Sequence, residues 1–549
     1  MTPAALVGIL GKWSKGEGPV YRRLSRAVAA AIERGEIEPG SRLPAERVLA
    51  EALAVSRTTV VSAYEELRGQ ERVESRRGSG TRVRGSLSRG PGLRLREDPS
   101  GSFRRHPVYR SLVDGPGDTI EFLGAHLPAP DLLAREIARV DEKEVRELAR
   151  GPGYLPMGLP ALRAAIARHV TGWGVATTED QVMVTHGAQQ AIGLAGALFL
   201  ERGDTVVVED PTYLGSIDIF TGLGARLAAV PVGGDAAWLN RLRELVKRAA
   251  PRLIYLMPTF QNPTGAVMPE ACRRALARLS KEMRIPILED NTLADLSLGG
   301  KPPAPIAAFD AAAPVLTIGS LSKLFWGGLR IGWIRAPEEL LARITRLKIM
   351  ADLGGSLVGQ LGAVRLIGEA ERVRQSRRRE MRERLDRLTK LLARHLPGWT
   401  WDAPAGGLSL WVKLPQGDAN AFAQVALRHG VAVVPGTLAS PGGGCGDRLR
   451  IPYVLDADPM KEGVERMARA WDAYAPTKGA RAARCSSSRP PSPPAPRPSG
   501  TCPETPGWSS TPRSHSSSSR NRGPRRGRPR TRRARRSSSR PRRSRPTRA

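Results

Sequence analysis

Side chains able to do chemistry follow the ends of five short apolar runs. The runs are residues 181–185, 204–209, 253–257, 285–289 and 315–318, and each is typical of a buried strand. Helical stretches separate most of them, which predicts a mainly parallel sheet covered on both faces. Ligands of such sheets bind beyond the carboxyl ends of the strands, so these side chains are candidates for one shared site.

Each strand end carries a different group. In chain order they are the glycine turn Gly187-Ala188-Gln189 opening a helix, the aromatic Tyr213, the amide Asn262, the carboxylate Asp290, and Ser320-Leu321-Ser322-Lys323 followed by Arg330. Taken singly, each has an ordinary structural explanation, such as a helix cap, a core tyrosine or a surface lysine.

Together these groups supply what a pyridoxal phosphate site needs. A lysine forms the Schiff base with the aldehyde, and a carboxylate holds the proton of the ring nitrogen. A helix N-terminus, hydroxyls and an arginine hold the phosphate. An aromatic side chain covers the ring, and an amide donates to the ring hydroxyl.

The order and spacing of these groups resemble the fold-type I aminotransferases over about residues 119–475. The resemblance implies that Lys323 forms the Schiff base and Asp290 pairs with the ring nitrogen. It implies further cofactor contacts from Asn262, Tyr213, Gly187, Ala188, Gln189, Ser320, Ser322 and Arg330. It also implies that Tyr154 reaches a neighbouring subunit's phosphate and that Arg450 binds the carboxylate of a substrate or effector.

Two departures from this family pattern bear on activity. The family usually has a tyrosine three residues after the aspartate, donating to the ring hydroxyl, and here that position is Leu293. Ala188 lacks the hydroxyl that is often present at its position. Neither change prevents cofactor binding, but losing a donor alters the acidity of the Schiff base. The resemblance therefore leaves open whether the chain transaminates.

The first part of the chain has a different pattern. A helical period runs from Val20 to Glu33, a second helix is expected to open around Pro44, and Ser56 is a good N-cap for a third. Two short helices with a tight turn are typical of a helix-turn-helix, whose second helix enters the major groove of DNA. Residues 72–84 alternate like the strands of a basic hairpin. The alternative is a small helical packing unit with a solvated charged face.

The string from Gly35 to Val83 resembles the GntR-type winged helix, with Ala45 where serine is usual. This resemblance implies binding to double-stranded DNA. The implied contacts are Arg47, Ser56, Arg57, Thr58, Thr59 and Gly78. A winged helix joined to an aminotransferase-like body is similar to the MocR group of transcription regulators over about residues 20–475.

The charge of the chain is unevenly distributed. The 549 residues carry a net charge of +33, which first points to nucleic acid as a partner. Residues 479–549 contain 20 arginines and one acid, Glu504, but no Leu, Ile, Val, Phe, Tyr or Met. We expect this tail to be disordered. Its composition also resembles GC-rich DNA translated in a wrong frame, so we hypothesise a frameshift or readthrough product after Lys478.

The cysteines and the hydropathy restrict the class of protein. Cys272, Cys445, Cys485 and Cys502 fit neither a zinc spacing nor a disulfide framework, so no metal site is predicted. No run of 18 or more apolar residues occurs. We expect a cytoplasmic, nucleoid-associated protein with no membrane contact.

The predicted organisation is a winged helix at 18–84, a flexible linker at 85–118, an α/β domain at 119–478 with a smaller C-terminal α+β part, and the tail. The predicted function is a pyridoxal phosphate-binding transcriptional regulator that senses the cofactor or an amino-acid or amine effector and acts as a homodimer on paired half-sites. One alternative is an active aminotransferase that carries a DNA-binding head. Another is an architectural nucleic-acid binder driven by the tail, whose binding would depend strongly on salt.

Overall fold

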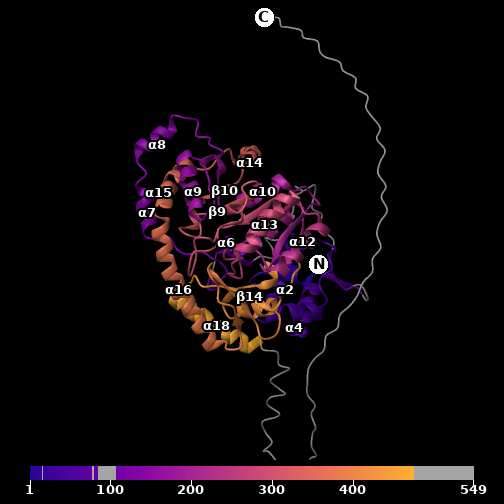
Figure 1. Cartoon of the computed structure of the whole chain (residues 1–549). Coiled ribbons are helices and arrows are strands. Elements are labelled where there is room, and N and C mark those ends of the chain that lie inside the picture. Colours follow the sequence, from indigo (N-terminus) through magenta and orange to yellow (C-terminus); the bar gives the residue numbers. More distant parts are fainter. Residues whose placement is uncertain (15, 77–79, 85–106, 116, 475–549) are drawn as a thin grey trace, which may run out of the picture. The chain divides into compact units, whose positions relative to one another are not determined.

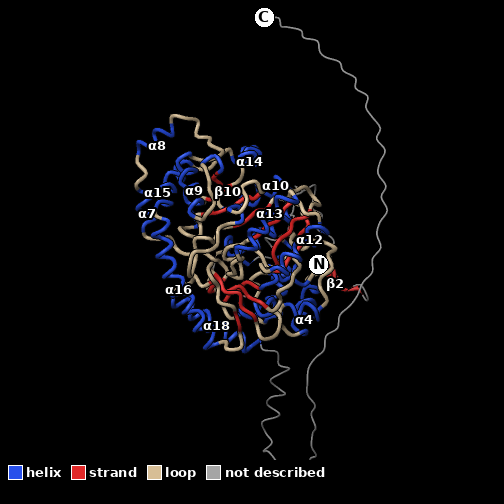
Figure 2. Tube along the Cα trace, viewed as in Figure 1, coloured by secondary structure: helices blue, strands red, loops and turns tan. Residues whose placement is uncertain are grey.

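The computed structural model of the chain describes residues 1–14, 16–76, 80–84, 107–115 and 117–474. Gly78 of the predicted wing, residues 85–106 of the predicted linker and the arginine-rich tail lie outside the described residues. The described chain forms an N-terminal helical head with a two-stranded ribbon, and an α/β body with two sheets (Figures 1 and 2).

The head has four helices and one ribbon. The helices are α1 (Pro3–Leu10), α2 (Val20–Glu33), α3 (Glu46–Ala52) and α4 (Arg57–Gly69), and β1 (Val73–Arg76) pairs antiparallel with β2 (Gly80–Val83). The apolar stripe of α2 faces a core of its own, shared with Leu49 of α3 and Leu67 of α4. The helix-turn-helix and the two strands of the wing are therefore present as the sequence predicts.

The two helices of the helix-turn-helix begin differently. Ser56 Oγ accepts a hydrogen bond from Thr59 N at 3.0 Å, so α4 has the predicted cap. In contrast, α3 begins only at Glu46, and Pro44 precedes the helix instead of lying in its first turn. Pro44 is held outside because its carbonyl accepts a hydrogen bond from Tyr64 Oη of α4 at 2.9 Å.

Seven strands form the large sheet of the body, in the order β4-β10-β9-β8-β7-β5-β6. They are β4 (Val182–Thr185), β5 (Thr205–Asp210), β6 (Arg226–Pro231), β7 (Leu253–Leu256), β8 (Ile287–Asp290), β9 (Val315–Ser320) and β10 (Gly332–Arg335). Strands β6, β5, β7, β8 and β9 pair in parallel, whereas β10 is antiparallel to β9 and β4. All five predicted strands are present, and the sequence pattern does not reveal β6 and β10.

The other helices of the body flank or follow this sheet. They are α7 (Leu132–Ala138), α8 (Glu142–Ala149), α9 (Pro160–Gly172), α10 (Ala188–Phe199), α11 (Leu214–Gly222), α12 (Ala236–Ala249), α13 (Glu270–Met283), α14 (Glu338–Asp352) and α15 (Leu357–Gly368). Short 3-10 turns are η1 (Glu179–Gln181), η2 (Ile306–Ala308), η3 (Gly327–Leu329) and η4 (Gly436–Ala439). Helix α10 follows β4 directly and contacts β4, β8, β9 and β10, so its first turn lies at the carboxyl edge of the sheet.

The second sheet has the order β11-β12-β14-β13-β3. Its strands are β3 (Ile120–Phe122), β11 (Thr400–Trp401), β12 (Ser409–Lys413), β13 (Val431–Pro435) and β14 (Arg448–Pro452), and it is accompanied by α16 (Ala370–His395), α17 (Ala419–Arg428) and α18 (Ala457–Tyr474). Figure 2 shows its strands beside α18. Because β3 pairs in parallel with β13, the first strand of the body belongs to the C-terminal part.

Helix α6 (Pro107–Asp114) lies inside the segment that the sequence predicts as a flexible linker. This part of the prediction is wrong. Val108 packs on a small cluster formed by Leu123, Ala432 and Val434. Tertiary packing stabilises such a short helix, and it leaves little trace in the periodicity of eight residues.

No helix in the part of the chain that the structure describes is long and apolar enough to cross a membrane.

Candidate functional site

Lys323 lies on the turn that follows β9. Its side chain is partly buried, and Nζ donates a hydrogen bond to the Ala125 carbonyl at 2.8 Å. Burial, helped by the positive charges of Arg450 and Arg330, lowers the pKa of Lys323 to about 8. About a tenth of this lysine is therefore a neutral amine at pH 7, far more than for an ordinary exposed lysine, and the neutral amine is the form that attacks a carbonyl group.

Asp290 ends β8 and is 2 % exposed. Its Oδ2 accepts a hydrogen bond from Tyr255 Oη at 2.8 Å, and its Oδ1 accepts one from Thr292 N at 2.9 Å. Burial raises the pKa of Asp290 although these hydrogen bonds and the charge of Lys323 oppose the change. A buried carboxyl group of this kind is stabilised as a carboxylate by a cation placed against it, as the protonated nitrogen of a pyridine ring would be.

Strand β10 brings two turns side by side. Gly332 pairs with Thr185 of β4 on one side and with Ser320 of β9 on the other. A Cβ atom on Gly332 would lie 2.6 Å from the carbonyl carbon of Gly187, so only glycine fits at this approach. The turn that opens α10 and the turn that carries Lys323 are therefore neighbours.

The groups on these turns form an anion cradle. Gly187 is the N-cap of α10 with φ 80°, and no side chain caps the first N–H groups of the helix at Ala188 and Gln189. Arg330 Nη2 donates to the His186 carbonyl at 2.8 Å beside this turn. Ser320 Oγ donates to Ser322 Oγ at 3.0 Å on the adjacent turn. Free N–H groups, hydroxyls and a guanidinium group fit a phosphate.

Two loops carry the aromatic and amide groups. Tyr213 precedes α11, and burial and the charge of Asp290 raise its pKa to about 12, which shows that its ring lies near that carboxylate. The side chain of Asn262 has no hydrogen-bond partner among the described residues. Gln261 Nε2 donates to the Pro211 carbonyl at 2.6 Å and so ties the two loops together.

Arg450 lies on β14 and is 5 % exposed. Its Nη2 donates to the Leu123 carbonyl, its Nε is buried without a partner, and no described carboxylate pairs with it. Burial lowers the pKa of Arg450 to about 10. Arg450 and Lys323 donate to carbonyls only two residues apart, those of Leu123 and Ala125, so the two side chains lie in the same region of the site. A buried guanidinium group without a carboxylate fits a ligand that supplies one.

Two family models match the chain. "Aminotransferase class I and II" matches residues 126–467, which is more than half of the chain, and "Bacterial regulatory proteins, gntR family" matches residues 20–83. The "Uncharacterized HTH-type transcriptional regulator YisV" of Bacillus subtilis is 31% identical over 446 residues, covering 78% of this chain and 91% of its own. The "Probable rhizopine catabolism regulatory protein MocR" of Rhizobium meliloti is 29% identical over 71% of this chain and 81% of its own. The chain belongs to the MocR-type regulators of the GntR family.

A solved structure supports the cofactor of this MocR-type body. LysN, the alpha-aminoadipate aminotransferase of Thermus thermophilus, was solved with N-(5'-phosphopyridoxyl)-L-leucine and is similar with a TM-score of 0.61 and 32% identity. The match covers 67% of this chain and 95% of LysN. Relatives with the aminotransferase class I and II fold depend on pyridoxal phosphate, and the residues around Lys323 fit that group.

In the MocR-type head, the predicted DNA contacts lie around the start of α4. Arg57 is largely exposed, and its Nη2 lies 3.9 Å from Glu46 Oε2; Thr58 and Arg47 are also exposed. The hydroxyls of Ser56 and Thr59 lie 2.8 Å apart and build the cap. The two exposed arginines are thus the freest of these groups to reach DNA.

One predicted site residue, Tyr154, differs in its surroundings from the others, and the structure adds two tyrosines that the sequence analysis did not predict. Tyr154 is 64% exposed, in contrast to the buried groups around Lys323 of its own chain. Tyr255 is a buried partner of Asp290, and its place in the middle of an apolar strand concealed it. Burial and the nearby Asp218 carboxylate raise the pKa of Tyr109 of α6, which also lies near Gln189, and no motif in the predicted linker could have indicated this position.

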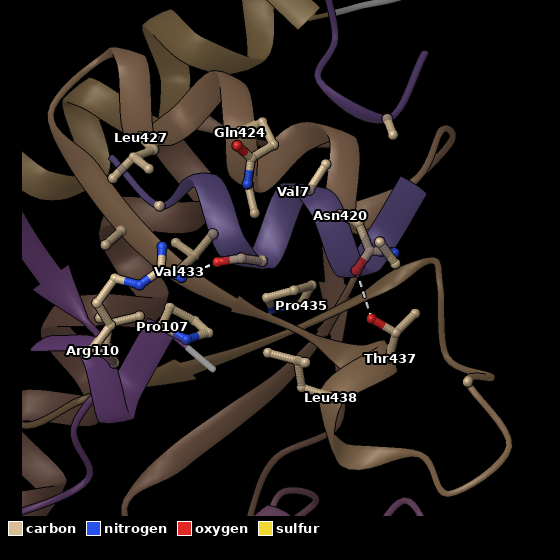
Figure 3. Close-up of a pocket in the computed structure, with 18 of the residues that line it drawn as sticks. Val7, Pro107, Arg110, Asn420, Gln424, Leu427, Val433, Pro435, Thr437 and Leu438 are labelled. Atoms are coloured by element: carbon tan, nitrogen blue, oxygen red, sulfur yellow. Dashed lines mark hydrogen bonds between the residues drawn. The ribbon is translucent and has the colours of Figure 1, made fainter. Parts of the chain in front are cut away.

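A separate cavity of about 730 Å³ lies between α1, α6, β13 and α17. Figure 3 shows Pro107 and Arg110 of α6 on one side, and Val7 of α1 on another, near Gln424 of α17. Lys323 and Asp290 do not line it, so this cavity is distinct from the cofactor site.

Proposed function

We propose that this MocR-type regulator binds pyridoxal phosphate at Lys323, senses an amino acid or amine beside it, and acts on DNA as a homodimer. The observation that carries the proposal is the buried Arg450, which has no carboxylate partner among the described residues and shares the 123–125 segment with Lys323 as a hydrogen-bond partner. It provides a place for the carboxylate of an amino acid within reach of the lysine.

Each residue then has a proposed role in binding. Lys323 holds the cofactor covalently, Asp290 pairs with its ring nitrogen, Tyr213 covers the ring, and Asn262 donates to the ring hydroxyl. The cradle of Gly187, Ala188, Gln189, Ser320, Ser322 and Arg330 holds the phosphate. When bound, the cofactor supplies an electrophilic carbonyl carbon that can exchange its lysine for an incoming amine.

We propose sensing instead of turnover because Leu293 is buried at the position where the family usually has a tyrosine. In this chain the phenol nearest the ring-nitrogen carboxylate is Tyr255, which donates to Asp290. A hydrogen bond from Tyr255 to Asp290 changes the pKa of that carboxyl group. It does not replace the hydrogen bond that the family's usual tyrosine donates to the ring hydroxyl of the cofactor.

Contacts within the described chain give the route from the site to the head. Tyr109 of α6 lies near Gln189 of the phosphate cradle, and Ser111 of the same helix donates a hydrogen bond to Glu121. Arg110 of α6 donates to the Gly8 carbonyl of α1 in the head (Figure 3). A change in the cradle on cofactor binding can therefore reach α1 through one short helix.

An exposed apolar patch supports the proposed homodimer. Met350 is 86% exposed at the end of α14, with Leu353 and Val358 after it. A Cβ on Gly354 would lie 2.9 Å from the Leu155 carbonyl, which places this segment beside Tyr154. Apolar side chains exposed together mark an interface, and Tyr154 would cross it to a neighbouring subunit's phosphate.

The experiment is DNase footprinting and light scattering with and without pyridoxal phosphate. We expect a protected pair of half-sites whose extent changes with the cofactor or with an added amino acid. Met350→Asp should shift the mass to that of a monomer, whereas Met283→Asp, on the exposed face of α13, should not. A footprint that is the same with and without the cofactor and amino acids would contradict the proposal that the protein is a sensor.

The competing function is amino-group transfer. A panel of amino acids and keto acids measures it, and a real transaminase would reach turnover of about 1–10³ s⁻¹. Turnover in that range would show that the chain is an enzyme with a DNA-binding head.

A further inference from the structure

Another cleft is lined by Asn291, the residue that directly follows Asp290. It has a volume of about 640 Å³, and its lining comes from the end of α9, the segment 291–305 and the start of α16. It includes neither Lys323 nor any residue of the phosphate cradle. The volume is within the range of small-molecule sites.

The cleft has an unpaired amide in its lining. Asn291 is 1 % exposed, and both its Oδ1 and its Nδ2 are buried without a hydrogen-bond partner. Its backbone is already held, because Asn291 N donates to the Ile318 carbonyl at 2.9 Å. A buried donor and a buried acceptor that both lack a partner are unfavourable, and a bound polar ligand would supply the missing hydrogen bonds.

The walls of the cleft are positively charged. Arg168, Lys301, Arg374 and Arg378 line it, against the two carboxylates Asp295 and Glu371. Both carboxylates are already paired with Arg374, at 2.9 Å and 2.6 Å. Among the described residues, Arg168, Lys301 and Arg378 have no ion-pair partner, so these cations are left for a ligand, and the four cations and two carboxylates of the lining give it a net charge of +2.

One side of the cleft is rigid. Asp295 accepts hydrogen bonds from Trp173 Nε1 at 3.2 Å and Arg374 Nη1 at 2.9 Å, and it lies 3.0 Å from His169 Nε2. These contacts fix α9 and α16 against the 291–297 turn, so the cleft exists before any ligand arrives. A preformed site loses less entropy on binding than one that must be ordered.

We propose that this cleft binds a small organic dianion, with Arg168, Lys301 and Arg378 on its charged groups and the Asn291 amide on a polar group between them. The net charge of +2 of the lining matches two negative charges, and the amide offers both donor and acceptor groups. Because Asn291 directly follows Asp290, a ligand here would contact the turn that holds the ring-nitrogen carboxylate.

Calorimetric titration of the full chain saturated with pyridoxal phosphate tests the proposal. The saturating cofactor keeps the phosphate cradle filled. The probes are succinate and glycerol 3-phosphate, with acetate at matched ionic strength as the monoanion. We expect saturable binding, at one site per chain, of at least one dianion, at least tenfold tighter than acetate. Binding of succinate would indicate a dicarboxylate site, and binding of glycerol 3-phosphate would indicate a phosphate ester site.

Variants locate the binding. The double variant Arg168→Ala/Lys301→Ala should weaken it at least tenfold, and so should Asn291→Asp, which places a negative charge in the same shape. The matched control Lys247→Ala/Arg248→Ala removes the same charge from the exposed face of α12 and should change nothing. Near-UV circular dichroism shows that each variant is folded.

Two results would overturn the proposal. One is the absence of saturable binding by either dianion. The other is equal binding by all variants, which would place the ions on the DNA-contacting head or elsewhere on the surface. Either result leaves the Lys323 site untouched, because the cofactor is read separately by its absorbance.

Discussion

Lys323 owes its reactivity to its surroundings. Burial is the largest cause of its lowered pKa of about 8, and the two neighbouring arginines add to it. A pKa lowered from the ordinary lysine value means that the neutral amine becomes available at lower pH. Below pH 8 the amine of Lys323 is mostly protonated and cannot act as a nucleophile. Above pH 8 most of it is already neutral, so a further rise in pH adds little.

We therefore predict that covalent attachment of pyridoxal phosphate accelerates about tenfold per pH unit below pH 8 and levels off above it. Stopped-flow absorbance of the near-visible band measures the rate, and borohydride reduction traps the link. Lys323→Ala should show neither band nor trapped link. A plateau that begins only near pH 10 would show that the lysine is not desolvated.

Arg450 differs from Lys323 because its role depends on the carboxylate of the ligand. Arg450→Gln removes the charge and keeps some polar contact. We predict that it weakens an amino acid about 10- to 100-fold, in line with a lost charged hydrogen bond, and leaves the cofactor bound. Spectral titration with an amino acid and with its decarboxylated amine measures this. The amine is the control, and an equal loss for both would contradict a carboxylate contact.

At the scale of elements, the close approach of β10 to the start of α10 is what forms the cradle. Gly332→Ala would place a Cβ 2.6 Å from the Gly187 carbonyl carbon, so the turn must move. We predict at least a tenfold loss of pyridoxal phosphate affinity, measured by absorbance titration. Gly193→Ala in α10 is the control, since a Cβ there meets nothing within 4 Å. Gly193→Ala should stabilise the chain by about 0.5–1 kcal/mol.

The elements also show which parts of the fold could be predicted from sequence. The runs that end in Thr185, Glu209 and Glu289 are continuous, apolar and followed by polar groups, so both strand and site were visible in them. β10 has only four residues, and its pairing with two distant strands decides its place. Helix α6 depends on packing against β13, which no local pattern encodes. Tyr255 was hidden because its hydroxyl partner lies on another strand.

At the scale of the molecule, a regulator needs a physical connection between its ligand site and its DNA-reading helix. Besides α6, one such contact is Arg428 of α17, whose Nη1 and Nη2 each donate at 2.8 Å, to the carbonyls of Leu53 and Ala54. Leu53 is the C-cap of α3, and Ala54 follows it in the turn that leads to Ser56, the cap of α4. Arg428 therefore holds the turn of the helix-turn-helix through two of its backbone carbonyls.

We predict that Arg428→Ala frees this turn. Losing two hydrogen bonds, each with a net contribution of about 1 kcal/mol, should speed amide hydrogen exchange in residues 53–57 about tenfold or more. It should also abolish the cofactor dependence of the footprint while leaving the absorbance of the bound cofactor unchanged. Arg394→Ala, on an exposed part of α16, removes the same charge and should change neither readout. Unchanged exchange in Arg428→Ala would mean that the turn is stable on its own and that the signal, if present, travels through α6 alone.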